Sequence, residues 1–179
     1  MHNIQIAERK STIVEQLRLR PKEYLLATVH RAENTDQSPE NLNNILSAFV
    51  DLSEAGMTVV FSVHPRTRKQ LGTFDRNTYP NLLLIDPVSY LDMLMLEKNA
   101  KTILTDSGGV QKEAYWFQVP CITLRDETEW VETVESGWNI LVGTSREKII
   151  EGALSSISPA IYSNYYGDGT AAKRITILF

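Results

Sequence analysis

Short apolar runs alternate with helix-period segments along most of this chain. The runs are strand-length, rich in branched residues and apolar on both faces, and they cover residues 24–29, 57–63, 82–85, 102–105, 121–124 and 139–142. Strands of this kind are typical of parallel sheets that helices cover on both sides. The helix-period segments cover residues 39–55, 90–99, 110–116, 129–135 and 145–156. The alternation predicts an α/β fold with an open parallel sheet and helices on both faces.

Local signals place the ends of two of these helices. Ser38 is a suitable N-cap for the segment 39–55, and Pro39 fits its first helical position. Gly56 follows that segment and Gly137 follows the fourth helical segment, where both fit C-terminal stops.

The length of 179 residues suits a single domain. We expect residues 20–157 to form the sheet domain, with an amphipathic N-terminal helix within residues 3–19 and a C-terminal tail over 157–179. A short helix is expected after Asp168. The final apolar run, ITILF, either docks on a neighbouring domain or subunit or packs back on this domain.

Charge and composition exclude several classes of partner. The chain has 18 basic and 22 acidic residues and no basic stripe, which argues against nucleic-acid binding. It has no apolar run long enough to span a membrane and no secretory signal, so we expect no membrane partner. The single cysteine, Cys121, cannot form an intrachain disulfide, and we expect a cytoplasmic location.

Three polar loops follow predicted strands at the edge where open parallel sheets bind ligands. They are HRAEN at 30–34, HPRT at 64–67 and DSGG at 106–109, and a helix is expected from Val110. The chain has neither a G-x-G-x-x-G fingerprint nor a Walker A loop. An anion site here would therefore differ from those of NAD-binding folds and P-loop ATPases.

The DSGG loop is the strongest candidate for an anion site. Gly108 and Gly109 allow a ligand to approach the backbone, Ser107 offers a hydroxyl, and the following helix presents unpaired N–H groups. These groups suit a phosphate or diphosphate. A purely structural turn in which Ser107 caps the helix fits the same residues, so both interpretations stay open.

Two further residues extend this hypothesis. Glu113 lies four residues after Gly109, on the same helix face, where a carboxylate can accept hydrogen bonds from a ribose diol. A dipole-stabilising or ion-paired glutamate is the competing interpretation. His30 ends the first strand, and a cationic imidazole there would stabilise a departing phosphate. His64 ends the second strand, and each histidine also suits a structural role.

An acidic segment raises the question of a metal. Asp126, Glu127, Glu129 and Glu132 lie close together, but no cysteine or histidine with metal-ligand spacing accompanies them. We interpret the segment as a polar helix start and expect no metal site.

Motifs across nearly the whole chain resemble the C-terminal half of the non-hydrolysing UDP-N-acetylglucosamine 2-epimerase family. They are TVHRAEN, SVHP, NLLLIDPVSYLD, ILTDSGGVQKEA, VPCITLRDETE, ILVG and YGDG. The resemblance implies a Rossmann-like, doubly wound parallel sheet that forms one half of a glycosyltransferase-B-type two-domain fold. It implies inversion of C2 in a UDP-N-acetylhexosamine, by elimination and re-addition of UDP, without a metal or nicotinamide.

The resemblance also implies roles for individual residues. Ser107, Gly108 and Gly109 match the diphosphate-binding loop, and Glu113 matches a ribose-binding glutamate. His30 matches a histidine that contacts the diphosphate and assists catalysis. Two more positions match the surroundings of the uracil: Val88, which would act through its backbone, and Met93, where the family often has an aromatic residue.

Two departures from the family pattern qualify these implications. The family often has E-R-P-E where this chain has E-W-V-E at 129–132, a variant that resembles members acting on UDP-diacetamido-uronic acids. The motifs of the family's N-terminal domain, which carries the acidic groups for proton transfer, are absent from these residues. We therefore expect this chain alone to bind UDP weakly and not to epimerise. The resemblance allows a homodimer.

Two other functions remain compatible with these motifs. A glycosyltransferase-B half-domain would hold a UDP-sugar in the same way but transfer its sugar to an acceptor. A non-catalytic nucleotide-sugar binding module would bind UDP without turnover.

Overall fold

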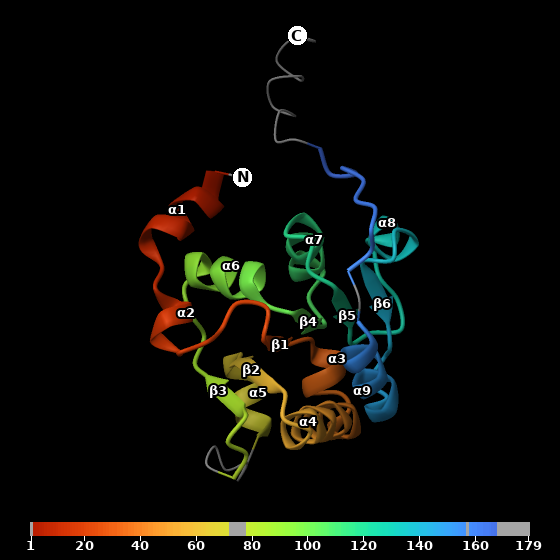
Figure 1. Cartoon of the computed structure of the whole chain (residues 1–179). Coiled ribbons are helices and arrows are strands. Elements are labelled where there is room, and N and C mark those ends of the chain that lie inside the picture. Colours follow the sequence, from red (N-terminus) through yellow and green to blue (C-terminus); the bar gives the residue numbers. More distant parts are fainter. Residues whose placement is uncertain (1, 72–77, 157, 168–179) are drawn as a thin grey trace.

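A parallel sheet forms the centre of the molecule (Figure 1). The computed structural model describes residues 2–71, 78–156 and 158–167, and within them six strands pair in the order β3-β2-β1-β4-β5-β6. The strands are β1 (Tyr24–Val29), β2 (Thr58–Val63), β3 (Leu82–Ile85), β4 (Thr102–Thr105), β5 (Cys121–Thr123) and β6 (Asn139–Leu141). All five pairings are parallel, so the predicted open parallel sheet is confirmed.

The strand order identifies the topology. The chain builds outward from β1 to β2 and β3, then returns to the other side of β1 and continues from β4 to β6. This is the order of a doubly wound, Rossmann-like fold, as predicted, and its direction reverses between β1 and β4. Tyr24–Val29 of β1 are all buried, as their central position requires.

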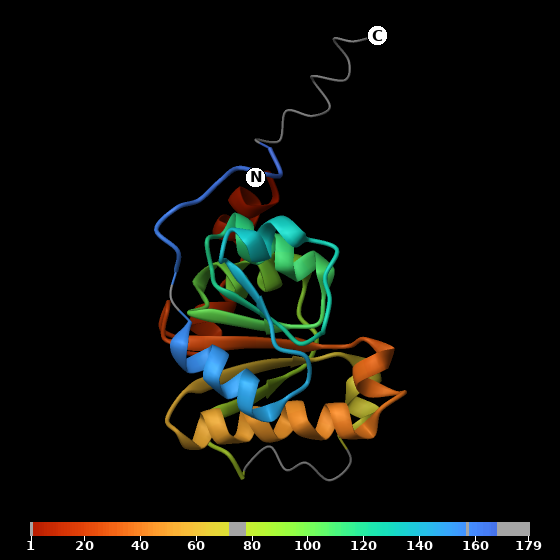
Figure 2. The same ribbon diagram turned by 90° about the vertical axis from the view of Figure 1, so that its right-hand side faces the viewer.

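Helices cover both faces of the sheet (Figure 2). α4 and α9 pack on one face, and α1, α2, α6 and α7 lie on the other. The helices of the described ranges are α1 (His2–Lys10), α2 (Ile13–Gln16), α3 (Ala32–Thr35), α4 (Pro39–Glu54), α5 (Pro65–Gln70), α6 (Tyr90–Asn99), α7 (Gly108–Trp116), α8 (Val131–Glu135) and α9 (Arg146–Ser155). No helix in these ranges is long and apolar enough to cross a bilayer.

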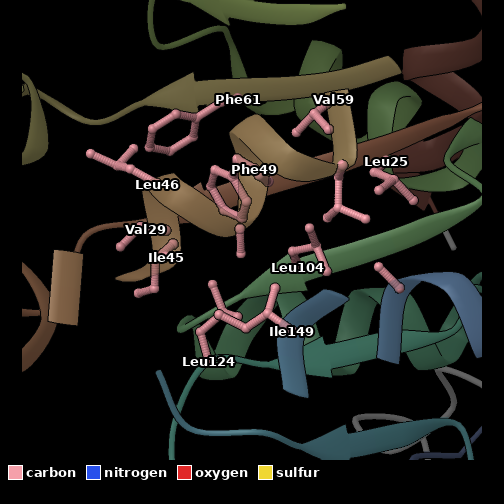
Figure 3. Close-up of a cluster of buried hydrophobic side chains, with 14 of the residues drawn as sticks. Leu25, Val29, Ile45, Leu46, Phe49, Val59, Phe61, Leu104, Leu124 and Ile149 are labelled. Carbon is pink, nitrogen blue, oxygen red and sulfur yellow. The ribbon is translucent and has the colours of Figure 1, made fainter. Parts of the chain in front are cut away.

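The apolar stripe of α4 builds the larger core cluster (Figure 3). Phe49 is fully buried and meets Phe61 of β2 edge-on, with ring centroids 5.4 Å apart. Ile149 of α9 and Leu104 of β4 complete the same cluster. Ser38 caps α4 by accepting a hydrogen bond from the Asn41 N–H, as its sequence position predicts.

Residues near the C-terminus form a segment with aromatic contacts to the domain. The ring of Tyr162 lies 5.0 Å from that of Tyr115, and Trp138 Nε1 donates to the Ile161 carbonyl at 3.0 Å. These contacts fix residues 158–167 against α7 and the β6 region. The expected helix after Asp168 and the run ITILF lie outside the described residues.

The structure differs from the sequence expectation at several element ends. The helix expected from Val110 begins at Gly108, because Ser107 adopts the N-cap position and accepts from the Val110 N–H. Two loops also contain short helices, α3 after β1 and α5 after β2. Helices of four and six residues are too short to show a hydrophobic period, so the sequence pattern does not reveal them.

Candidate functional site

The loops after β1, β2, β3 and β4 meet around a pocket of about 190 Å³ at the carboxyl edge of the sheet. Its lining includes His30, His64, Val88, Met93 and Ser107. The pocket lies where the strand order reverses between β1 and β4, which is the usual ligand position in this fold. The topology therefore brings together residues from four loops that are far apart in the sequence.

Asp106 organises the floor of this edge. It follows β4, is 0% exposed, and accepts hydrogen bonds from the backbone N–H groups of His30 and Arg31 at 3.1 and 3.0 Å. Asn34 Nδ2 also donates to it at 3.2 Å and to the Leu124 carbonyl at 3.0 Å. Asp106 thus ties the loop after β1 to the end of β4.

The same carboxylate orients the imidazole of His30. His30 Nδ1 lies 3.2 Å from Asp106 Oδ1, which leaves Nε2 for a ligand. Burial by itself raises the pKa of the Asp106 carboxyl, but hydrogen bonds from His30 and the Arg31 amide outweigh burial and lower that pKa. Asp106 is therefore charged at neutral pH.

His64 faces His30 across the pocket but is held differently. The two ring centroids are 5.6 Å apart. His64 is also the N-cap of α5, because its Nδ1 accepts the Arg66 N–H at 3.2 Å. Nε2 therefore carries the proton in the neutral ring. His64 has the structural role that the sequence left open, and it also lines the pocket.

The start of α7 supplies the groups that suit an anion. Ser107 lines the pocket, and its Oγ accepts from the Val110 N–H at 3.5 Å. Neither glycine lines the pocket, and their surroundings differ. A Cβ on Gly108 would meet Trp130 Nε1 at 3.0 Å, whereas a Cβ on Gly109 would meet nothing nearer than Ser107 Oγ at 3.8 Å. Packing therefore explains Gly108, and open space surrounds Gly109.

Glu113 lies farther along α7 and does not line the pocket. It accepts a hydrogen bond from the Tyr90 hydroxyl at 2.9 Å, from the first turn of α6. Burial raises the pKa of Glu113, although hydrogen bonding by Tyr90 and the charge of Lys112 oppose that rise. Of the seven site residues expected from the sequence, the pocket collects His30, Ser107, Val88 and Met93.

An ion-pair cluster lies beside the pocket. Glu129 accepts from Arg125 Nη1 at 3.0 Å and pairs with Arg31 at 3.4 Å. The bond from Arg125 lowers the pKa of Glu129 to about 2. Glu129 of the acidic segment is thus engaged with two arginines. Within the described ranges, no group of three or more His, Cys, Asp or Glu residues is arranged to hold a metal ion.

Asp106 is the site residue that sequence reasoning missed. The D-S-G-G motif was assigned through its serine and glycines, but the acid comes directly after the central strand β4. An acid in that position was the available signal. Its partners lie more than 70 residues away, so only the β1–β4 pairing shows what it binds.

Comparison with known proteins places this geometry in a family. The family model described as UDP-N-acetylglucosamine 2-epimerase matches residues 1–178. The chain belongs to the UDP-N-acetylglucosamine 2-epimerase family. The predicted resemblance is therefore confirmed, and with it the half of a glycosyltransferase-B-type fold.

Individual members of the family are similar over nearly the whole chain. A UDP-N-acetylglucosamine 2-epimerase homolog of Methanococcus maripaludis is 52% identical over 98% of this chain and 50% of its own length. The UDP-2,3-diacetamido-2,3-dideoxy-D-glucuronate 2-epimerase of Pseudomonas aeruginosa is 46% identical over 85% of this chain and 43% of its own length.

Solved structures of the family have the same fold. The Methanocaldococcus jannaschii UDP-GlcNAc 2-epimerase, in complex with UDP-GlcNAc and UDP, matches with a TM-score of 0.86 and 43% identity. The match covers 99% of this chain and 50% of that structure. The chain therefore spans about half the length of the family members it matches.

Proposed function

We propose that this chain is the UDP-binding half of an epimerase that inverts C2 of a UDP-N-acetylhexosamine. The pocket between β1 and β4 supports this proposal, because His30, Ser107, Val88 and Met93 converge there from separate parts of the chain. A nucleoside diphosphate needs an anion site beside a surface for its base. The helix start and His30 suit the anion, while Val88 and Met93 suit the base.

Each residue then has a chemical task. The Ser107 hydroxyl and the first amides of α7 receive the diphosphate, and Glu113 accepts hydrogen bonds from the ribose hydroxyls. His30, held by Asp106, stabilises charge on the diphosphate as it departs. Val88 contacts the uracil through its backbone, and Met93 covers the ring.

The reaction proceeds by elimination and re-addition. A base removes the C2 proton of the sugar, the C1–O bond to UDP breaks, and UDP leaves with that electron pair. UDP then adds back to C1 as a proton returns to the opposite face of C2. This chain's residues bind and stabilise UDP, whereas the proton-transfer groups are assigned to the N-terminal domain that the family resemblance implies.

This division of tasks defines the domain organisation that we propose. Residues 20–157 form the UDP-binding domain, with an N-terminal helix and a C-terminal tail that flank it. The partner is a domain of the kind that makes up the other half of the relatives, and a homodimer is compatible with the arrangement. These 179 residues by themselves bind UDP weakly and do not epimerise, because no positioned base completes the site.

The substrate sugar belongs to the UDP-N-acetylglucosamine group or its diacetamido-uronic relatives. Similarity at 52% and 46% identity to members with these two names supports both sugars. Trp130 occupies the position where the family often has an arginine. This variant resembles the members that act on UDP-diacetamido-uronic acids.

Calorimetry with UDP tests the binding site. We expect Glu113→Ala to weaken binding by about 1–3 kcal/mol, the cost of a lost hydrogen bond to a charged group. Unchanged affinity would contradict the ribose assignment.

A chain supplied with the other half-domain should convert UDP-GlcNAc without an acceptor, as followed by NMR. A requirement for an acceptor would favour a glycosyltransferase, and UDP binding without turnover would favour a binding module.

A further inference from the structure

Glu97 of α6 is a buried acid that the proposed mechanism does not use. Its side chain is 0% exposed, and no donor in the part of the chain that the structure describes gives a hydrogen bond to either carboxyl oxygen. An ionised carboxylate without a partner in such a place is costly. Burial, and then the charge of Glu113, raise the pKa of Glu97 well above its usual value. Burial without a partner therefore favours the neutral form of Glu97.

The position of Glu97 relates it to Glu113. Tyr90 and Glu97 are seven residues apart on α6, which places them on the same helix face. The Tyr90 hydroxyl donates to Glu113 from that face at 2.9 Å, and α7 packs against α6. The Glu113 carboxylate therefore lies over the face that also carries Glu97.

The other titratable groups around Glu97 do not compete for this role. Tyr24 of β1, Tyr90 of α6 and Cys121 of β5 all lie close enough to interact electrostatically with an ionised Glu97. Burial raises the pKa of each of these groups, so all three are neutral at neutral pH. Glu113 is thus the anion that acts on Glu97, and Lys112 is the cation that acts on Glu113.

We propose that Glu97 is a neutral carboxylic acid whose O–H donates to Glu113 and holds that carboxylate where it accepts the ribose hydroxyls. Glu97 is a positioning residue, because it acts on the nucleotide only through Glu113. The inference rests on the proposed function, since it takes Glu113 to be the ribose acceptor.

In this arrangement, two neutral donors on α6 hold the Glu113 carboxylate in place. Tyr90 donates to Glu113 from one end of α6 and Glu97 donates from the other, so the carboxylate is held between two neutral donors. Neutral donors fix its position without cancelling its charge, and its remaining lone pairs face the diol. An ionised Glu97 would repel Glu113 instead. A leucine at position 97 would fill the space but leave Glu113 held from one side.

Paired nucleotides test this role. Calorimetry compares UDP with 2′,3′-dideoxy-UDP on the wild-type chain, Glu97→Leu, Glu97→Gln and Glu113→Ala. We expect the wild type to prefer UDP and Glu97→Leu to lose about tenfold in UDP affinity, with little change for the dideoxy nucleotide. Glu97→Gln should restore the preference, because its amide N–H also donates.

The possible outcomes separate this inference from the proposed function. If Glu113→Ala removes the preference for UDP and Glu97→Leu retains it, the role of Glu97 is overturned and the ribose site stands. If the wild type shows no preference, the ribose site fails and so does the role of Glu97. Equal losses for both nucleotides in Glu97→Leu, matched by the core variant Phe49→Leu, would indicate a packing role and contradict the proposal.

Infrared spectroscopy gives a second measurement that is independent of ligand binding. The difference spectrum between wild type and Glu97→Gln at pH 7 should contain the carbonyl band of a protonated carboxylic acid. A carboxylate band in its place would overturn the neutral state of Glu97.

Discussion

Helices α4 and α7 begin with the same capping chemistry but serve different purposes. Ser38 accepts from the Asn41 N–H at 3.4 Å, and Ser107 accepts from the Val110 N–H at 3.5 Å. At the first helical position, α4 has Pro39, which has no N–H, and α7 has Gly108, which keeps one. α7 therefore offers one more amide to a ligand than α4 does.

The surroundings of the two helix starts differ as well. Asn41 in the first turn of α4 donates to the Glu33 carbonyl and accepts from Thr144, so other parts of the chain occupy this end. Ser107 at the start of α7 lines the pocket at the switch point of the sheet. A serine cap by itself therefore indicates only a helix start. The open pocket, the extra amide and the neighbouring Asp106–His30 pair distinguish a candidate ligand site.

The largest expected effect on stability comes from Asp106, the buried acid that precedes the Ser107 cap of α7. The residue that precedes the Ser38 cap of α4 is Gln37, which is not an acid. Asp106→Asn replaces one carboxylate oxygen with an NH2 group, so the N–H groups of His30 and Arg31 and the Asn34 amide compete for a single acceptor oxygen. We expect a loss of about 3 kcal/mol in the free energy of unfolding, measured by urea denaturation. UDP affinity should also fall, because His30 loses its orienting partner. A variant as stable as the wild type would show that these hydrogen bonds are dispensable.

The pH dependence of stability checks the same residue. Because the pKa of Asp106 is lowered in the folded state, its contribution is fully present above its unfolded pKa of about 3.9. The contribution is lost as the pH falls through the lower, folded pKa. The difference in unfolding free energy between wild type and Asp106→Asn should therefore be constant near neutral pH and shrink below about pH 4. A difference that stays constant in acid would contradict the lowered pKa.

Much of the fold follows from local sequence patterns. The six apolar runs predict the six strands, and the cap and stop residues Ser38 and Gly56 bound α4 as expected. Gly56 has a φ of +88°, which explains a glycine at that stop. These features depend on residues within one turn or one strand, so the sequence contains the information directly.

The long-range parts of the candidate site do not follow from such patterns. In the sequence, Glu97 resembles a surface acid, followed by Lys98 near the end of a helix. It becomes buried only in the folded chain, where α6 packs against α1, α2 and α7. In the sequence, the residues beside Gly108 suggest a ligand-binding loop. Only the structure shows that Trp130 packs against Gly108 and leaves little room for a side chain there.

The matched serine variants give the next largest effect. Ser38→Ala and Ser107→Ala each remove a helix cap, so we expect similar losses of about 1 kcal/mol in the free energy of unfolding. Only Ser107→Ala should weaken UDP binding, as measured by calorimetry. The difference in UDP affinity between the two variants then isolates the ligand contribution from the cap. Equal UDP affinities in both variants would limit Ser107 to a structural role.

The smallest expected effect on stability distinguishes the two glycines that begin α7. Gly109→Ala places its Cβ in open space and adds a better helix former, so stability should stay within about 1 kcal/mol of the wild type. Gly108→Ala forces its Cβ to within 3.0 Å of Trp130 Nε1, and we expect it to be the less stable variant.

If a diphosphate approaches the α7 amides, the methyl group at position 109 should weaken UDP binding by about tenfold, or about 1.4 kcal/mol, without a loss of stability. Thermal denaturation and calorimetry on both variants measure the two quantities separately. A Gly109→Ala chain that binds UDP like the wild type would mean that the ligand does not approach this turn, and α7 would then resemble α4 in having only a structural cap.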